Sequence, residues 1–466
     1  MVLRHGCSFL SKKLSKTVRN FARQHAPVPK LTPQEVTKIL QTNEFTKEFN
    51  DNSSVKSYDT NQLASNNPIE DMRSEARCKL TNGFLFGIFD GHGGNECSQV
   101  ISKRLFYYIA ACLLPTATLK DAIETKKSPV EFKNHLLETF NDNVEFVTEL
   151  GKLYNKSYLS FIQELTKSNK SDVEVELALE HAFLRLDQDL SAEAFEKLDR
   201  REMARTLSVA MSGSVAIVAH IDGPHLHVAN VGDCQAVLGV HSENEGWSAQ
   251  LMSVEHNVDN CEEVKRILSE HPEREKNTVI KVERLLGQLA PLRALGDFRY
   301  KWTRDIMNKI VVPYFGETAI PPNYHTPPYL SAKPQTSYHK LTPKNKFLIL
   351  ASDGLWDLMT PLEAVHLVGE HMTDKVATIS LPLSTDNLKL SQINEILIQR
   401  KESLKKKPLD DNAATHLLRN ALGGTEYGID HLRLSKFLTL PNEVVRIFRD
   451  DITITVVYIN SEFLQN

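Results

Sequence analysis

The 466-residue sequence has little of what marks several common protein classes. Its six cysteines are scattered and form no C-x-x-C pair, which argues against a disulfide framework or a zinc site and suits a reducing compartment. No apolar run approaches the roughly 18 residues that a membrane-spanning helix needs. The formal net charge is only -4, so composition gives no reason to expect a nucleic-acid partner. We therefore expect a soluble globular protein without a membrane span.

Acidic residues are missing from the N-terminal segment, where the first one is Glu35. Before it, basic residues from Arg4 to Lys30 are interleaved with apolar ones. A basic, serine-containing, amphipathic segment without acids is typical of a mitochondrial transit peptide, although a basic disordered tail would have the same composition. We predict a transit peptide over about residues 1–28, an N-terminal extension over 29–57, and a location in the mitochondrial matrix.

Short apolar runs and turn signals predict strands in consecutive groups. Buried strands are expected at Phe84–Phe89 and Phe347–Ala351, a closing strand at Ile452–Ile459, and a hairpin around Asp222–His225. The polar stretch Asp51–Asn67 is expected to be a loop or an irregular strand. Helical patterns occur at Leu31–Phe49, Asn95–Leu113, Val173–Leu190, Cys261–Glu270 and Pro361–His371. Such grouping favours an α+β fold with antiparallel pairing over a doubly wound parallel sheet.

Three stretches look like insertions into this pattern, near residues 116–171, 302–341 and 373–409. The second is rich in proline. The third contains the basic run Lys405–Lys407, which we interpret as a solvated face or loop and not as a binding patch.

Several acids share one local context, because each lies at the end of an apolar strand beside a glycine or another acid. They are Asp90, Asp233, Asp353, the pair Asp450–Asp451 and, upstream, the pair Glu70–Asp71. Each alone is weak evidence, since an isolated Asp-Gly is most often a turn. Together, hard carboxylate ligands at strand ends suit Mg²⁺ or Mn²⁺ better than zinc, and two such ions can assist phosphoryl transfer. Whether these acids meet in space is not visible in the sequence.

His92 lies between glycines and has little apolar company. A histidine packed in the core is therefore less expected here than elsewhere. Because its ordinary pKa is near neutrality, we predict a role as acid or base, or as a hydrogen-bond donor to a leaving group. Support of a neighbouring metal ligand is the alternative.

These residues belong to motifs that resemble those of the PPM-type metal-dependent serine/threonine protein phosphatases. The matching segments follow family order: Ile69–Asp71, Phe86–Gly94, Asn230–Asp233, Arg293–Asp297, Ser352–Asp357 and Asp450–Thr453. The resemblance implies an antiparallel β-sandwich flanked by helices on both sides, in four αββα layers. It covers a single phosphatase domain over residues 58–460.

The resemblance also implies a role for each acid. Asp90 would bridge two Mg²⁺ or Mn²⁺ ions, with Gly91 a ligand through its carbonyl. Asp353 and Asp450 would hold one ion, Glu70 would support the other through water, and Asp233 and Asp357 match positions linked to a third, weaker ion. A hydroxide bridging the two metals would attack phosphorus directly, and His92 would protonate the serine leaving group.

One position departs from the family pattern. Many relatives carry a phosphate-binding arginine four residues before the glutamate of the Glu-Asp motif, and here that position is Asn66. Arg73 and Arg77 are speculative substitutes, so no phosphate-binding residue is predicted.

Three further segments resemble the pyruvate dehydrogenase phosphatases within this family: Arg104–Ile109, Pro321–Tyr329 and Asn412–Leu417. They imply phosphoserine on the pyruvate dehydrogenase E1 α subunit as substrate, docking to the lipoyl domains of the transacetylase, and a regulatory subunit. Ca²⁺ could act through that docking, but the sequence does not say whether it stimulates the enzyme. The alternatives are a phosphatase for another mitochondrial phosphoprotein and a non-catalytic scaffold on the same fold.

Overall fold

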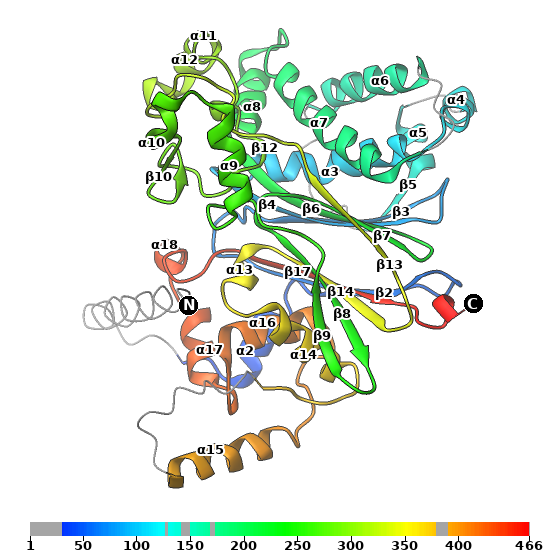
Figure 1. The fold of residues 1–466 in the computed structure, drawn as a ribbon, viewed down its shortest axis with the longest axis vertical. Coiled ribbons are helices and arrows are strands. Elements are labelled where there is room, and N and C mark those ends of the chain that lie inside the picture. Colours follow the sequence, from blue (N-terminus) through cyan, green and yellow to red (C-terminus); the bar gives the residue numbers. More distant parts are fainter. Residues whose placement is uncertain (1–29, 126–128, 141–149, 168–172, 379–389, 466) are drawn as a thin grey trace.

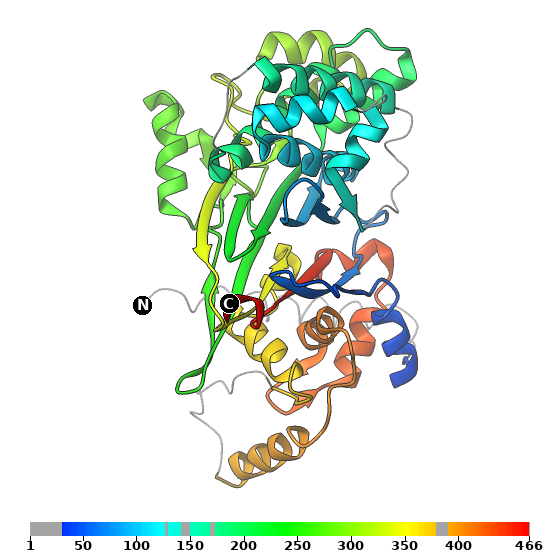
Figure 2. The same ribbon diagram turned by 90° about the vertical axis from the view of Figure 1, so that its right-hand side faces the viewer.

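The computed structural model describes residues 30–125, 129–140, 150–167, 173–378 and 390–465, and Figure 1 shows their arrangement. Two antiparallel sheets lie face to face, and helices cover the outer side of each (Figures 1 and 2). The predicted α+β sandwich is therefore confirmed. The predicted transit peptide, residues 1–28, lies outside the described residues.

The upper sheet has the strand order β13-β7-β6-β4-β3-β5, with the short β12 paired to β6. Its strands are β3 (Met72–Cys78), β4 (Phe84–His92), β5 (Leu137–Thr139), β6 (Gly213–Asp222), β7 (His225–Val231), β12 (Leu295–Gly296) and β13 (Gln335–Lys340). The helices above it are α3 (Glu96–Cys112), α4 (Thr116–Thr125), α5 (Pro129–Leu136), α6 (Gly151–Lys167), α7 (Val175–Glu193) and α8 (Arg200–Met211). The hairpin predicted around Asp222–His225 joins β6 to β7.

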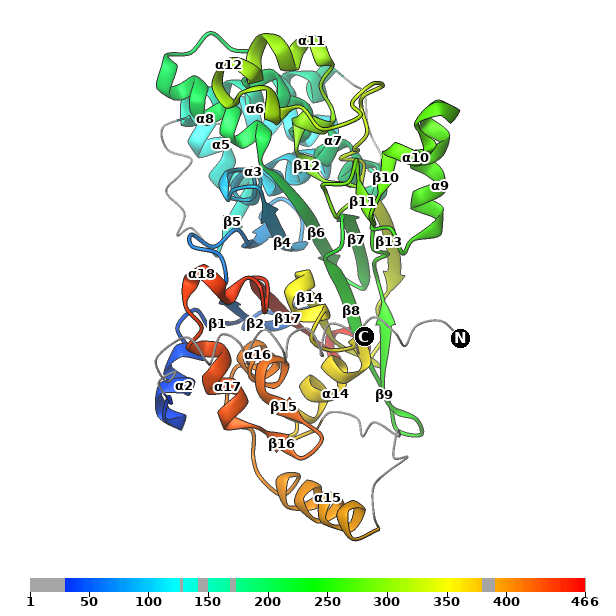
Figure 3. The same ribbon diagram turned by 90° about the vertical axis from the view of Figure 1, so that its left-hand side faces the viewer.

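The lower sheet has the strand order β1-β2-β17-β14-β8-β9. Its strands are β1 (Phe45–Glu48), β2 (Val55–Leu63), β8 (Gln235–Ser242), β9 (Gly246–Leu251), β14 (Asn345–Ala351) and β17 (Ile452–Ile459). The helices below it are α2 (Pro33–Leu40), α14 (Pro361–His371), α16 (Ala413–Gly423) and α17 (His431–Leu438), and α15 (Leu390–Ser403) projects farthest from the sheets (Figures 1 and 3).

Strand β4 is buried on both faces, which explains its unbroken apolar sequence. Phe84, Phe86 and Ile88 pack into the core between the sheets, whereas Leu85 and Phe89 pack under the upper helices. Side chains alternate along a strand, so the next residue on the inter-sheet side after Ile88 is Asp90. The Asp90 carboxylate therefore lies between the two sheets at the end of the sandwich.

The polar stretch Asp51–Asn67 contains strand β2, which pairs with β1 and β17 and is more regular than predicted. The face of β2 that carries Asp59 and Asn61 is polar because it meets the lower helices through hydrogen bonds, whereas Tyr58 packs between the sheets. Asp59 accepts from the Ala413 backbone N–H at 2.8 Å, and Asn61 donates to the Thr415 hydroxyl at 2.7 Å. A hydrophobic pattern cannot reveal a strand of this kind.

The helix expected over Leu31–Phe49 ends at Leu40, and β1 follows. Its start is as predicted, because Thr32 caps the helix and Pro33 occupies the first turn. Val36 and Leu40 are buried in the core beneath the lower sheet. The segment regarded as an N-terminal extension thus contributes a helix and a strand to the same sandwich.

Of the three expected insertions, residues 116–171 contribute α4, α5, β5 and α6. Residues 302–341 form short helical turns and then strand β13, which pairs with β7 along six residues. The described part of 373–409 contains α15. Across the described ranges, no helix combines the length and apolarity needed to cross a membrane.

Candidate active site

Strand register brings the acids to one end of the sandwich. In the upper sheet, the end of β4 pairs with the start of β6, His92 opposite Gly213. In the lower sheet, the end of β14 lies beside the starts of β8 and β17. Asp90 lies near the end of β4, Asp233 lies where the chain passes from β7 to β8, Asp353 follows β14, and Asp450 precedes β17. The acids that the sequence places at strand ends therefore lie together at one end of the sandwich.

The carboxylates lie close enough to perturb one another. Burial, together with repulsion from Asp71, Asp353 and Asp233, raises the pKa of Asp90 well above its ordinary value. The pKa of Asp353 rises in the same way, through burial and the charges of Asp233 and Asp357. Both side chains remain partly exposed, so ions and water can reach them. A group of like charges held this way calls for a cation.

Glu70 is fixed from two sides by the turn after β4. The Gly94 backbone N–H donates to its carboxylate at 2.8 Å, and the Ser98 hydroxyl donates to its carbonyl at 2.5 Å. Any side chain at Gly91 would collide with that carbonyl and with Ser98. The glycine beside Asp90 is therefore needed for the close approach of the two segments.

Asp451 organises the loop that precedes β3. Its carboxylate accepts the backbone N–H groups of Ser65, Asn66 and Glu70 at 2.5, 2.8 and 2.8 Å. The Asn66 side chain donates to the same carboxylate at 2.9 Å and lies 3.4 Å from Asp450. Asn66 thus holds the paired aspartates in place, which is a structural role at the position where the family resemblance led us to expect arginine.

His92 is paired with Asp297. The Nε2 of His92 lies 2.5 Å from Oδ2 of Asp297, which is 3% exposed. Burial alone would lower the pKa of His92, but the charge and hydrogen bond of Asp297 raise it above its ordinary value. The carboxylates of Asp297, Asp233 and Glu70 therefore favour the protonated form of His92 more than water would. The sequence assigned Asp297 no role, although the segment Arg293–Asp297 was among the matching motifs.

The two arginines considered for phosphate are paired with other carboxylates. Arg73 pairs with Glu75 at 2.7 Å, and Arg77 pairs with Asp51 at 2.5 Å. Arg77 is opposite Phe84 in the register, at the end of β3 far from Asp90. At the site itself, Arg446 reaches Glu70 at 3.1 Å and Asp450 at 3.9 Å, and its side chain is half exposed.

A protein-family model described as Protein phosphatase 2C matches residues 121–395. The chain is 44% identical over 460 residues to pyruvate dehydrogenase (acetyl-transferring)-phosphatase 1, mitochondrial, of Rattus norvegicus, covering 94% of this chain and 85% of that protein. The Homo sapiens protein of the same name is also 44% identical, with 94% and 86% covered. Phosphatase 2 of Homo sapiens is 41% identical, with 93% and 84% covered.

The chain belongs to the protein phosphatase 2C family. It is a phosphatase, and the family depends on Mg²⁺ or Mn²⁺. The matched range includes Asp233, Asp297 and Asp353, whereas Glu70, Asp90 and Asp450 lie outside it. The register of the sheets nevertheless brings both sets of acids to the same end of this phosphatase.

The donors of the phosphatase fit a magnesium-type ion. Within the ranges that the structure describes, no three His, Cys, Asp or Glu side chains form a compact metal-binding group. An ion here would therefore take one or two carboxylates and complete its shell with backbone carbonyls and water, as Mg²⁺ usually does. Burial first and neighbouring carboxylates second raise the pKa values of Asp90 and Asp353, and such an ion would offset both effects by stabilising the charged carboxylates.

Asp233 and Asp357 lie close enough to Asp353 to influence its pKa. Burial raises the pKa of Asp233 to about 6, with smaller contributions from Glu255 and Asp357. Asp357 is exposed and directly follows the short helix α13 (Asp353–Trp356). The two carboxylates repel each other, so a cation near them would reduce that repulsion.

Proposed function

We propose that this phosphatase removes phosphate from phosphoserine on the E1 α subunit of the pyruvate dehydrogenase complex in the mitochondrial matrix. The observation that carries the proposal is 44% identity, across 94% of the chain, to proteins named as phosphatases of that enzyme. Activation of the complex would follow from removal of the phosphate.

In this proposal Asp90, Gly91, Asp353 and Asp450 hold two divalent ions, with Glu70 acting through water. When bound, the ions supply Lewis acidity and an activated water for attack on phosphorus. His92 gives its proton to the serine oxygen as that oxygen leaves, because Asp297 keeps the imidazole protonated and oriented. Asp233 and Asp357 form the outer, weaker ion site.

We further propose that Arg446 binds the substrate phosphate. Arg446 would take over the role that the family resemblance assigns to an arginine at position 66, which is Asn66 here. Its half-exposed guanidinium lies beside the carboxylates of Glu70 and Asp450. A guanidinium can bind phosphate through two parallel hydrogen bonds. Arg449, by contrast, is committed to the Ser65 hydroxyl at 2.5 Å and the Ala64 carbonyl at 2.8 Å.

Docking to the lipoyl domains of the transacetylase, a regulatory subunit and an effect of Ca²⁺ through docking belong to the same proposal. Their support is the resemblance of Arg104–Ile109, Pro321–Tyr329 and Asn412–Leu417 to the pyruvate dehydrogenase phosphatases. In the structure the first of these segments is internal, since Arg104 forms a buried pair with Glu193 at 2.7 Å. That segment therefore supports the fold and offers no docking surface.

The proposed substrate is tested by phosphate release from phosphorylated E1 α and from a generic phosphoserine peptide, each with Mg²⁺ or Mn²⁺. We expect a much higher kcat/KM for E1 α, and a further rise when the transacetylase core and Ca²⁺ are added. Efficient hydrolysis of the peptide with none of E1 α would refute the substrate and leave the phosphatase intact. No hydrolysis of either would refute the catalytic proposal.

A further inference from the structure

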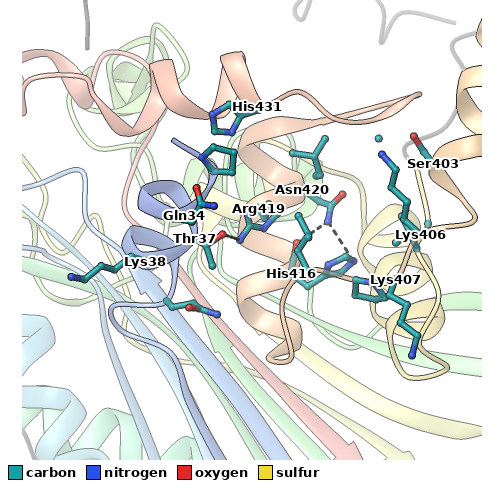
Figure 4. A pocket seen from close by; sticks show the side chains of 18 of the residues that line it. Gln34, Thr37, Lys38, Ser403, Lys406, Lys407, His416, Arg419, Asn420 and His431 are labelled. Carbon is teal, nitrogen blue, oxygen red and sulfur yellow. Dashed lines mark hydrogen bonds between the residues drawn. The ribbon is translucent and has the colours of Figure 1, made fainter. Parts of the chain in front are cut away.

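A second site lies below the lower sheet, away from the acids. A cavity of about 1020 Å³ opens between α2, α16 and the segment that follows α15 (Figure 4). Helix α2 lines it with one face, through Gln34, Thr37 and Lys38. It shares no lining residue with the candidate active site. Its volume is at the upper end of the range of sites that bind small molecules.

The charge of this cavity differs from that of the whole chain. The sequence has 59 acidic and 55 basic residues, yet no acidic residue lines the cavity. Lys38, Lys406 and Lys407 lie at its rim, and Lys407 pairs with Asp374 at 2.7 Å. In the described part of the chain, neither Lys38 nor Lys406 forms an ion pair. The basic run that looked like a solvated face thus borders a cavity.

The floor of the cavity offers polar groups. Arg419, His416 and Asn420 come from one face of α16, and each is at most 4% exposed. Arg419 donates to Asp410 through Nε and Nη2, both at 2.7 Å, and Nη2 also donates to the Thr37 hydroxyl at 3.0 Å. The Nδ1 of His416 is buried without a hydrogen-bond partner among the described residues. A buried nitrogen of this kind favours a polar ligand.

Apolar side chains complete the lining. They are Pro408, Leu409, Val376, Ala377 and Ile429. Leu409 is 69% exposed, so a ligand that covered it would remove apolar surface from water. A ligand that matches this lining would therefore contain an anionic group and an apolar part.

The chain's own N-terminal segment does not suit this cavity. Residues 1–29 carry basic side chains and no acid, so they would meet the rim lysines with charge of the same sign. We propose that the cavity binds a small amphipathic carboxylate, whose anion lies near Lys38, Lys406 and Arg419 while its apolar body covers Leu409 and Ile429.

The test uses octanoate as the probe and octan-1-ol as its uncharged counterpart, with the full chain and calorimetry. We expect saturable binding of octanoate at least about tenfold tighter than that of the alcohol, which corresponds to roughly 1.4 kcal/mol. The affinity for octanoate should fall as salt is added. Equal affinity for the two probes, or no saturable binding of octanoate, would overturn the proposal.

Two variants locate the site without endangering the fold. Lys406→Gln removes a rim charge, and Gln34→Glu places an acid in the first turn of α2, where helices tolerate acids well. Each should weaken octanoate binding about fivefold or more. The matched control is Lys405→Gln, because Lys405 is the neighbour of Lys406, pairs with Glu402 at 2.6 Å and does not line the cavity. An equal effect of Lys405→Gln and Lys406→Gln would contradict the assignment.

Discussion

His92 and Asp297 meet directly over the Cα of Gly213. Their side chains approach to 2.5 Å, and a Cβ added at Gly213 would overlap both His92 Nε2 and Asp297 Oδ2. The three residues come from the end of β4, the segment after β12 and the start of β6. The missing side chain of Gly213 therefore makes room for the pair that holds the proposed proton donor.

Gly213→Ala should separate this pair. We expect kcat to fall about tenfold to a hundredfold, since positioned proton donors contribute roughly a hundredfold or more. The melting temperature should change little if the two side-chain ends move aside. Steady-state kinetics and thermal melts measure the two effects.

The matched control for this change is Gly151→Ala. Gly151 begins α6, and a Cβ there would meet nothing within 4 Å. It should leave kcat unchanged. A Gly213→Ala enzyme with the kcat of the unaltered protein would show that the contact between His92 and Asp297 has no part in the reaction.

The elements with strong apolar patterns were readable from the sequence. Cys261–Glu270, Pro361–His371 and Ile452–Ile459 have the predicted bounds. The strand β2 was not readable as regular, because Asp59 and Asn61 face helix α16 through hydrogen bonds instead of apolar contacts.

At the site, the sequence showed that the acids lie at strand ends. The register of the two sheets explains why these strand ends lie close together. The partners of those acids were not visible. Asp297 contacts His92 from 205 residues away, and Arg446 contacts Glu70 from 376 residues away. No local pattern encodes such distant contacts.

Arg446→Gln should weaken recognition of phosphate. Because a charge-assisted hydrogen bond contributes about 1.5–3 kcal/mol, we expect kcat/KM for a phosphopeptide to fall by roughly tenfold to a hundredfold, mainly through KM. Binding of inorganic phosphate, measured by calorimetry, should weaken in parallel. The control is Arg77→Gln, since Arg77 lies at the far end of β3 and pairs with Asp51. If both variants keep the original KM, another group binds the phosphate.

Glu263 should make folding stability depend on pH. Burial alone would raise its pKa, but Arg293 and Arg266 lower it to about 2. A depressed pKa stabilises the fold above the unfolded-state value and ceases to do so as pH falls through the folded-state value. We expect Glu263→Gln to lose about 2 kcal/mol of unfolding free energy near neutral pH, and the difference from the unaltered protein to shrink between about pH 4.5 and about pH 2.

Urea denaturation over this pH range measures the effect. The control is Glu262→Gln, because Glu262 is its exposed neighbour and pairs with Lys265 at the surface. A difference for Glu263→Gln that does not change with pH would contradict the role of the arginines. The same substitution should also lower kcat modestly, since Arg293 precedes Asp297 by four residues.

The most direct test of the metal site measures Mn²⁺ binding to the unaltered protein and to Asp90→Asn by calorimetry. Phosphate release is assayed on the same samples. We expect tight, multi-site binding and Mn²⁺-dependent hydrolysis in the unaltered protein. In Asp90→Asn, affinity should fall by at least about tenfold, which is roughly 1.4 kcal/mol, and hydrolysis should be lost while the melting temperature without metal is kept. Unchanged Mn²⁺ binding and hydrolysis in Asp90→Asn would contradict the assignment of the acids at the end of the sandwich as the metal site.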